Sequence, residues 1–244
     1  MTVFLTSSPS GSLDDSHPVD GLDEMNGFAE QLRQRWKPGA RCLIIAASPE
    51  SCGMNDGMAA FFAQAMERAG LSGAAFDVWD ARLEWDARER IFSYDVILLG
   101  GGHVPTQQRF FGELQLRELL AQWDGMVIGI SAGTMNSAET VYAQPELPGE
   151  SVDPDYQRFL PGLGLTQTMI LPHYQMVKDD LLDGRRLYED ITYPDSHGRE
   201  FLVLPDGSYL LIEDGHETVF GEAWRLSNGC LHRICGTDQS VLWR

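Results

Sequence analysis

Short apolar runs alternate with amphipathic segments along the first half of the chain. Continuous apolar runs predict buried strands, and apolar residues that recur every three to four positions predict helices. The predicted strands are 3–5, 42–46, 76–79, 95–99 and 126–130, and the predicted helices are 24–36, 56–69 and 106–123. A polar loop rich in Ser, Asp and Pro follows the first strand and ends near Gly21. This alternation indicates a parallel sheet with helices on both faces.

The pattern changes beyond about residue 200. Short strands are predicted at 201–204, at 209–212 and within 219–235. The turn dipeptides Asp206-Gly207, Asp214-Gly215 and Asn228-Gly229 lie between or within these segments. We therefore predict an antiparallel β extension at the C-terminal end. With 244 residues, 43% of them hydrophobic, the chain can form a sizeable core, and we predict one domain over 1–244.

Charge and the N-terminal sequence narrow the choice of partners. The formal net charge of −18 would repel a phosphate backbone, so nucleic acid is not an expected partner. The N-terminus has neither a basic start nor a long apolar run, and no apolar run elsewhere reaches membrane-spanning length. We predict a cytoplasmic protein without a membrane partner. Its four cysteines are expected to be reduced, with Cys42 packed as a small hydrophobic residue.

The segment Gly129-Ile130-Ser131-Ala132-Gly133 directly follows an apolar strand. Small residues on both sides of a serine permit a sharp strand-to-helix turn that exposes the hydroxyl. The N–H of Ala132 would point towards a developing oxyanion, and the following helix would direct its positive dipole end there. The segment therefore predicts that Ser131 is the nucleophile of a hydrolase. A serine in an ordinary strand–helix turn is the alternative.

A glycine run, Gly100-Gly101-Gly102, follows the preceding strand. Such a run permits close backbone approach and unusual dihedral angles, so the N–H of Gly101 or Gly102 is a candidate second oxyanion donor. A phosphate-binding loop or a plain turn is the alternative. No lysine follows at the spacing of a P-loop and the G-x-G-x-x-G pattern is absent, so nucleotide binding is disfavoured and no cofactor is predicted.

A serine nucleophile needs a base and an acid that orients the base. His173 follows an apolar run at a predicted strand end and is the candidate base. His103, beside the glycine run, is the second candidate base, but it is assigned to the substrate pocket. The histidines at 197, 216 and 232 are expected on the surface, and no pair has the spacing of metal ligands, so no metal site is predicted. Asp206 is the candidate acid; its rivals are Glu146, Glu150, Glu213 and Asp214.

These motifs resemble those of the dipeptidase E and cyanophycinase family of serine peptidases. The resemblance spans most of the chain and is carried by the glycine run, the serine segment, Leu-Pro-His-Tyr at 171–174 and Leu-Pro-Asp-Gly at 204–207. It implies a class I glutamine amidotransferase-like (flavodoxin-like) fold, a three-layer α/β/α sandwich with a mostly parallel central sheet. It also implies a triad of Ser131, His173 and Asp206, where dipeptidase E has Glu in place of Asp206. The order serine, histidine, acid differs from that of α/β-hydrolases.

The resemblance further implies a short peptide substrate and an acyl-enzyme, with an N-terminal aspartate as one candidate specificity. Arg185 or Arg186 could bind the aspartyl carboxylate through a bidentate contact, and solvated arginines are the alternative. A serine esterase or amidase acting on a non-peptide substrate, and an inactive binding module of the same fold, also stay open. Glutamine amidotransferase activity is disfavoured because that chemistry in this fold uses a Cys at the position where this chain has Ser131. A homodimer is left open.

Overall fold

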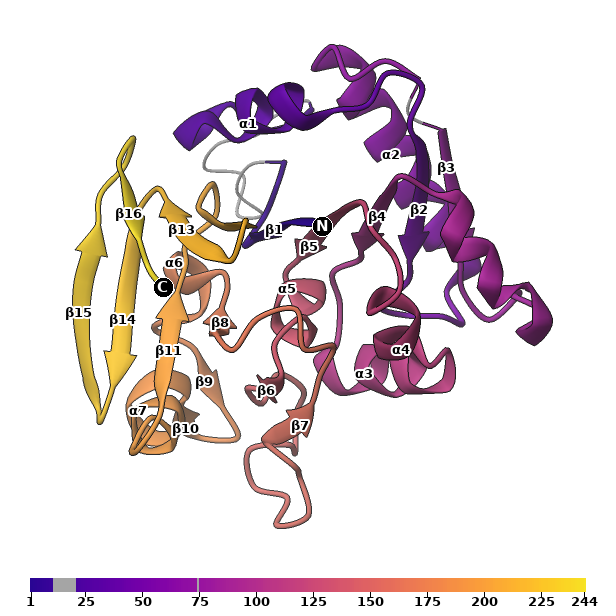
Figure 1. Cartoon of the computed structure of the whole chain (residues 1–244). Helices are drawn as coiled ribbons and strands as arrows, with labels where there is room; N and C mark the ends of the chain where they lie inside the picture. The colour runs from indigo at the N-terminus through magenta and orange to yellow at the C-terminus, as the bar shows by residue number, and fades with distance from the viewer. Residues whose placement is uncertain (11–20, 74) are drawn as a thin grey trace.

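The computed structural model describes residues 1–10, 21–73 and 75–244, so most of the predicted polar loop lies outside the described residues. Its largest sheet has eight strands in the order β16-β13-β12-β1-β5-β4-β2-β3 (Figure 1). The parallel strands are β1 (Thr2–Thr6), β5 (Met126–Ile130), β4 (Val96–Leu99), β2 (Arg41–Ile45) and β3 (Ala75–Trp79). The antiparallel strands are β12 (Tyr209–Glu213), β13 (His216–Phe220) and β16 (Ser240–Leu242).

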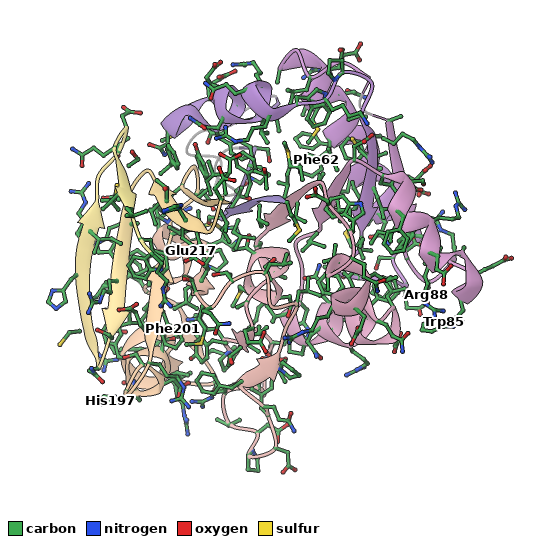
Figure 2. The ribbon with its side chains drawn as sticks, in the orientation of Figure 1. Phe62, Trp85, Arg88, His197, Phe201 and Glu217 are labelled. Carbon is green, nitrogen blue, oxygen red and sulfur yellow. The ribbon has the colours of Figure 1, made fainter. Side chains whose placement is uncertain are left out.

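Helices cover both faces of this sheet, as the alternation of strands and helices predicts. The helices are α1 (Phe28–Arg35) and α2 (Cys52–Arg68) on one face and α3 (Val104–Glu113) and α4 (Leu116–Leu120) on the other (Figure 1). Side chains alternate between the faces of a strand. Phe4 of β1 therefore belongs to one core cluster with Phe28 of α1 and Phe62 of α2, and Figure 2 labels Phe62. Its neighbour Leu5 belongs to the other cluster, which includes Phe110 of α3. The predicted three-layer α/β/α architecture is confirmed.

The C-terminal strands divide between two sheets. A second sheet has the order β15-β14-β11-β8 and consists of β8 (Met169–Leu171), β11 (Glu200–Val203), β14 (Ala223–Ser227) and β15 (Cys230–Cys235). Strands β8 and β11 are parallel, so their carboxyl ends lie side by side. Ile170 and Leu202 pack in the same core cluster as Leu210 of the large sheet. The sequence predicted the C-terminal strands other than β16, which lies beyond the predicted stretch 219–235. It did not predict their division between two sheets.

Smaller elements connect these layers. They are the 3-10 helices Met25–Gly27 and Trp85–Ser93, α5 (Ala132–Asn136), β6 (Thr140–Tyr142), β7 (Phe159–Pro161), α6 (Tyr174–Val177), β9 (Leu181–Leu182), β10 (Arg185–Arg186), the π-helix Leu187–Thr192 and α7 (Tyr193–Asp195). The predicted helix 106–123 is two helices, because Gln115 adopts a left-handed φ of 53° between α3 and α4. Glu217 is buried in β13 and accepts hydrogen bonds from Thr166 and Thr168 (Figure 2).

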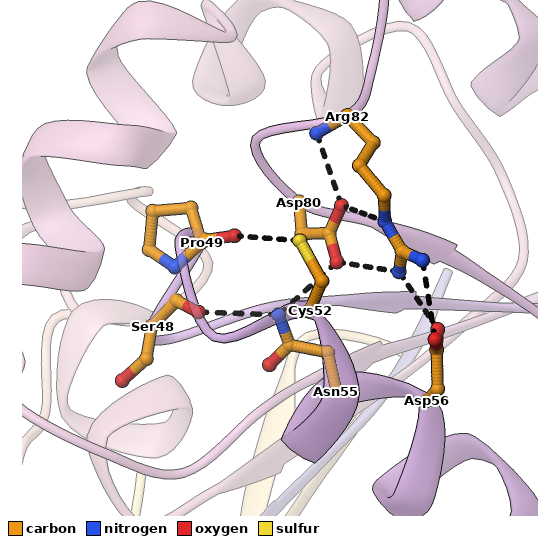
Figure 3. Close-up of polar contacts among 7 residues, drawn as sticks. All are labelled: Ser48, Pro49, Cys52, Asn55, Asp56, Asp80 and Arg82. Carbon is orange, nitrogen blue, oxygen red and sulfur yellow. Dashed lines mark hydrogen bonds and ion pairs between the residues drawn. The ribbon is translucent and has the colours of Figure 1, made fainter.

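A polar network ties the carboxyl ends of β2 and β3 to the start of α2 (Figure 3). Arg82 donates to the buried Asp80 (2.9 and 2.7 Å) and to the exposed Asp56 (3.1 and 2.7 Å). Asn55 donates to Asp80 and to the carbonyl of Ser48, each at 3.1 Å. The network therefore fixes the loop between β2 and α2, which also contacts the glycine run after β4.

Two further expectations concern cysteines and surface histidines. The four cysteines are free, and burial raises the pKa of Cys42 to about 12, as fits a packed apolar role. His197, His216 and His232 are exposed, as predicted, and Figure 2 places His197 at the periphery. Within the described ranges, no helix is long and apolar enough to cross a membrane.

Candidate active site

Ser131 lies on a strained turn between β5 and α5. Its φ of 50° and ψ of −111° are unusual for a residue with a side chain and belong to a sharp strand-to-helix junction. The end of β1 supports this turn. The Ser131 N–H donates to the Thr6 carbonyl (3.2 Å), the Thr134 hydroxyl donates to the same carbonyl (2.7 Å), and the Thr6 hydroxyl donates to the Gly129 carbonyl (2.8 Å).

The two motif glycines are required by close packing around the turn. A Cβ added at Gly133 would lie 2.2 Å from the carbonyl oxygen of Leu99 in β4. A Cβ at Gly129 would lie 3.0 Å from the Cα of Thr134. Side chains at these positions would push α5 away from the sheet. The G-x-S-x-G pattern thus follows from the geometry that exposes the serine.

Backbone donors surround the serine. A Cβ added at Gly101 would lie 3.4 Å from the Cβ of Ser131, so the glycine run packs directly against the nucleophile candidate. Gly102 lines the same cavity as Ser131. No described residue accepts a hydrogen bond from the N–H of Gly101, Gly102 or Ala132. Such unpaired donors beside a nucleophile are suited to the negative charge that develops on a substrate oxygen.

His173 and Asp206 meet at the carboxyl ends of β8 and β11. His173 Nδ1 donates to Asp206 Oδ1 at 2.6 Å, and the two side chains are 14% and 3% exposed. The parallel pairing of β8 with β11 explains the contact, because His173 lies shortly after the end of β8 and Asp206 lies shortly after the end of β11. With Nδ1 held by the carboxylate, Nε2 is the nitrogen left to exchange a proton.

Two residues that sequence reasoning missed hold this pair. The Ser7 hydroxyl donates to Asp206 Oδ1 (2.7 Å) and accepts from the His173 N–H (2.8 Å). The Gln175 amide donates to Asp206 Oδ2 (2.8 Å), and its carbonyl accepts from the Asp206 N–H (3.0 Å). Ser7 could have been found in the sequence from its position just after the first strand, because the other candidate residues also follow strand ends.

Ser131 and His173 line one cavity of about 230 Å³. Its other lining residues include Gly102, Glu146 and several apolar side chains. No hydrogen bond joins the Ser131 and His173 side chains, both of which the structure describes. The predicted nucleophile and the predicted base thus line the same cavity, while a direct contact between them stays a prediction.

His103 occupies a neighbouring place and has both ring nitrogens engaged. Nδ1 contacts the Thr106 hydroxyl at 2.8 Å, and Nε2 contacts Glu150 Oε1 at 2.7 Å. Glu150 Oε2 accepts the N–H groups of Glu146 (2.8 Å) and Leu147 (2.9 Å). His103 and Glu150 therefore hold the loop that carries Glu146 to the cavity, and His103 itself is outside the cavity lining. Its predicted contact with substrate stays a prediction.

The other candidate residues, Glu213, Arg185 and Arg186, do not line the cavity that Ser131 and His173 line. Glu213 accepts two hydrogen bonds from Arg35 (2.9 and 2.8 Å), which also lower the pKa of its carboxyl. Arg185 and Arg186 lie exposed on β10, outside the cavity lining, and Arg186 pairs with Asp190 at 2.8 Å. The substrate-binding role expected of these arginines stays a prediction.

A mostly parallel α/β/α sheet with a serine elbow beside a His–Asp pair has the architecture of a serine hydrolase. The chain belongs to Peptidase family S51, whose family model matches residues 49–220. It is therefore a peptidase, and the matched region holds the serine elbow, His173 and Asp206.

The fold is also found among solved structures. One crystal structure, of a protein from Listeria monocytogenes EGD-e provisionally named a peptidase E, is similar with a TM-score of 0.52 and 16% sequence identity. The similarity covers 96% of this chain and 97% of that chain. At this identity the similarity concerns the fold. No curated protein matches the sequence.

Proposed function

We propose that the protein hydrolyses short peptides by acyl transfer to Ser131, with His173 as the base and Asp206 as the acid that orients it. The 2.6 Å contact between His173 Nδ1 and Asp206 Oδ1, on the cavity that Ser131 also lines, is the observation that carries the proposal. The small size of this cavity, about 230 Å³, favours a short substrate over a folded protein.

The first half of the reaction forms the acyl-enzyme. His173 Nε2 takes the proton of the Ser131 hydroxyl while Oγ bonds to the scissile carbonyl carbon. The carbonyl oxygen becomes an oxyanion, which the N–H groups of Ala132 and of Gly101 or Gly102 stabilise. The imidazolium then gives its proton to the leaving amine as the C–N bond breaks, and Asp206 stabilises the positive charge on the ring throughout.

The second half regenerates the enzyme. Water attacks the ester carbonyl, and His173 takes one of its protons. The same backbone donors hold the second oxyanion, and the proton returns to Ser131 as the acid product leaves. The atoms balance as one peptide bond and one water becoming an amine and an acid.

The test is peptidase activity of the full chain on a panel of dipeptides and tripeptides. We expect Ser131→Ala and His173→Ala each to lower kcat by about a thousandfold or more, and Asp206→Asn by about a hundredfold or more. The control is Ser93→Ala, an exposed serine that bonds the Arg90 carbonyl remote from the cavity. Retention of full activity by Ser131→Ala would contradict the proposal, and hydrolysis of esters but of no peptide would favour the esterase alternative.

A further inference from the structure

The cavity beside Ser131 has an unexpected charge for an enzyme that takes an aspartyl residue. Besides His173, its charged lining consists of two carboxylates, Glu146 and Asp180. Among the described residues that line it, none is a lysine or an arginine. Most of the remaining wall is apolar and includes Met135 and Leu187.

Glu146 is fixed in place but has no partner of its own. Its backbone N–H is held by Glu150, and its carboxylate makes no hydrogen bond or ion pair with a described residue. The residue is exposed, yet the surrounding walls remove enough water from the carboxylate to raise its pKa. Its neighbour Glu150 raises the pKa further, while His103 and His173 lower it. A partly desolvated carboxylate without an ion-pair partner among the described residues is stabilised by an incoming cation.

The two arginines that were expected to bind an acidic substrate do not line the cavity. Arg186 forms an ion pair with Asp190, and Arg185 pairs in register with the cavity residue Leu182 but does not line the cavity itself. An aspartyl side chain in the cavity would therefore meet Glu146 and Asp180 with like charge, which costs free energy at short range.

The apolar lining of the cavity includes an exposed leucine. Leu181 of β9 lines the cavity and is 71% exposed. Asp183, in the turn after β9, accepts hydrogen bonds from Gly149 and Ser151, so β9 is fastened to the loop that carries Glu146. Glu146, Asp180 and Leu181 thus lie on segments of the cavity lining that are connected by hydrogen bonds or by the chain itself.

We propose, resting on the peptidase function above, that this cavity selects peptides whose acyl-side residue combines an apolar side chain with a cationic amine and rejects an acidic residue. Glu146 and Asp180 are its specificity-determining residues. The shared chemistry is an ammonium group beside apolar carbon. The α-amino group of an N-terminal residue and the amine of a lysyl side chain are its two sources.

The experiment compares kcat/KM for Leu-Phe, Asn-Phe, Asp-Phe, N-acetyl-Leu-Phe and N-acetyl-Lys-Phe with the full chain. Asn-Phe matches the shape of Asp-Phe without its charge. We expect Asp-Phe to be at least about tenfold slower than Asn-Phe, with Leu-Phe the best substrate. A tenfold or larger loss on acetylation of Leu-Phe identifies the α-amine as the cation, whereas efficient cleavage of N-acetyl-Lys-Phe identifies a side-chain amine.

Variants connect this preference to the two carboxylates. Glu146→Gln and Asp180→Asn should each lower kcat/KM for the cationic substrate about tenfold and raise the rate on Asp-Phe. The change should be smaller for N-acetyl-Leu-Phe, which carries no amine. The control is Asp179→Asn, whose carboxylate lies next to Asp180 in sequence, pairs with Lys178 at 3.9 Å and does not line the cavity. It should leave every rate unchanged.

The outcomes separate the inference from the function on which it rests. Asp-Phe cleaved as fast as Asn-Phe, or Glu146→Gln and Asp180→Asn without effect on these ratios, would overturn the inference while leaving a peptidase. Failure to hydrolyse any peptide of the panel or of the wider panel above would contradict the peptide-hydrolysing function itself, and the inference with it.

Discussion

Ser131 and His173 both adopt positive φ angles, 50° and 58°, in which residues with side chains are strained. Hydrogen bonds from neighbouring strands hold them there: Thr6 accepts the Ser131 N–H, and Ser7 accepts the His173 N–H. Consecutive residues at the end of β1 thus support both halves of the proposed catalytic centre. At these two residues the strain lies in the turns that present the side chains to the cavity.

Ser7 is a positioning residue whose loss should change catalysis more than folding. Ser7→Ala removes a donor from Asp206 and an acceptor from the His173 N–H. We expect kcat to fall about tenfold with little change in KM. The acidic limb of the kcat/KM profile should move to higher pH, because the carboxylate that loses a donor attracts the proton on the imidazole more strongly. Ser93→Ala is again the control. An unchanged kcat and pH profile would show that Ser7 only packs.

At this scale the sequence was informative where residues belong to motifs at strand ends. Ser131, His173 and Asp206 each end or follow an apolar run, and the last two are in contact as predicted. The parts played by Ser7 and Gln175 depend on β1, β8 and β11 meeting, and local sequence does not specify that meeting.

At the scale of elements, α5 packs closely on the sheet. Gly133→Ala should destabilise the protein by about 2 kcal/mol or more, because its Cβ would lie 2.2 Å from the Leu99 carbonyl oxygen. Gly57→Ala is the matched control, since this glycine lies inside α2 with nothing within 4 Å of an added Cβ. It should stabilise by about 0.5–1 kcal/mol. Urea unfolding measures both, and equal effects of the two variants would contradict the packing described for α5.

The elements themselves were largely predictable, and the exceptions have a physical cause. β5 has the predicted bounds, and the β12–β13 and β14–β15 turns fall at Asp214-Gly215 and Asn228-Gly229, where φ is positive at all four residues. The division of α3 from α4 was not predictable, because Gln115 is not a helix-breaking residue type. Leu114 and Leu116 on either side of it are both buried, so tertiary packing sets the break.

At the scale of the whole molecule, the Asp80 network should contribute to stability in a pH-dependent way. Burial alone would raise the pKa of Asp80, but hydrogen bonds from Arg82 and Asn55 lower it below its ordinary value. The native state therefore binds this proton less tightly than the unfolded chain. The contribution is present above the unfolded-chain pKa of about 3.9 and is lost as the pH falls through the lowered value.

We expect Asp80→Asn to lower the free energy of unfolding by about 2–3 kcal/mol at pH 7, because Arg82 and Asn55 lose a 1%-exposed partner. The difference from the wild type should shrink as the pH falls below 4. Asp56→Asn removes the exposed partner of the same arginine and should change stability little. Urea unfolding from pH 7 to pH 3 measures this, and a pH-independent difference would contradict the account.

The pairing of distant strands is where sequence reasoning stopped. The apolar runs and turn dipeptides identify strands, but similar runs in β11 and β12 enter different sheets. That choice follows from which strand each meets: β12 pairs with β1, and β11 pairs with β8. The same choice places His173 beside Asp206, so the site is a consequence of the long-range topology.

The central claim is that Ser131 is an activated nucleophile. The most direct measurement is labelling of the folded full chain with a fluorophosphonate, followed by peptide-level mass spectrometry. We expect one adduct, on Ser131, which is absent in Ser131→Ala and forms far more slowly in His173→Ala. The absence of an adduct on Ser131, while a known serine hydrolase in the same reaction is labelled, would contradict the account and favour a binding module.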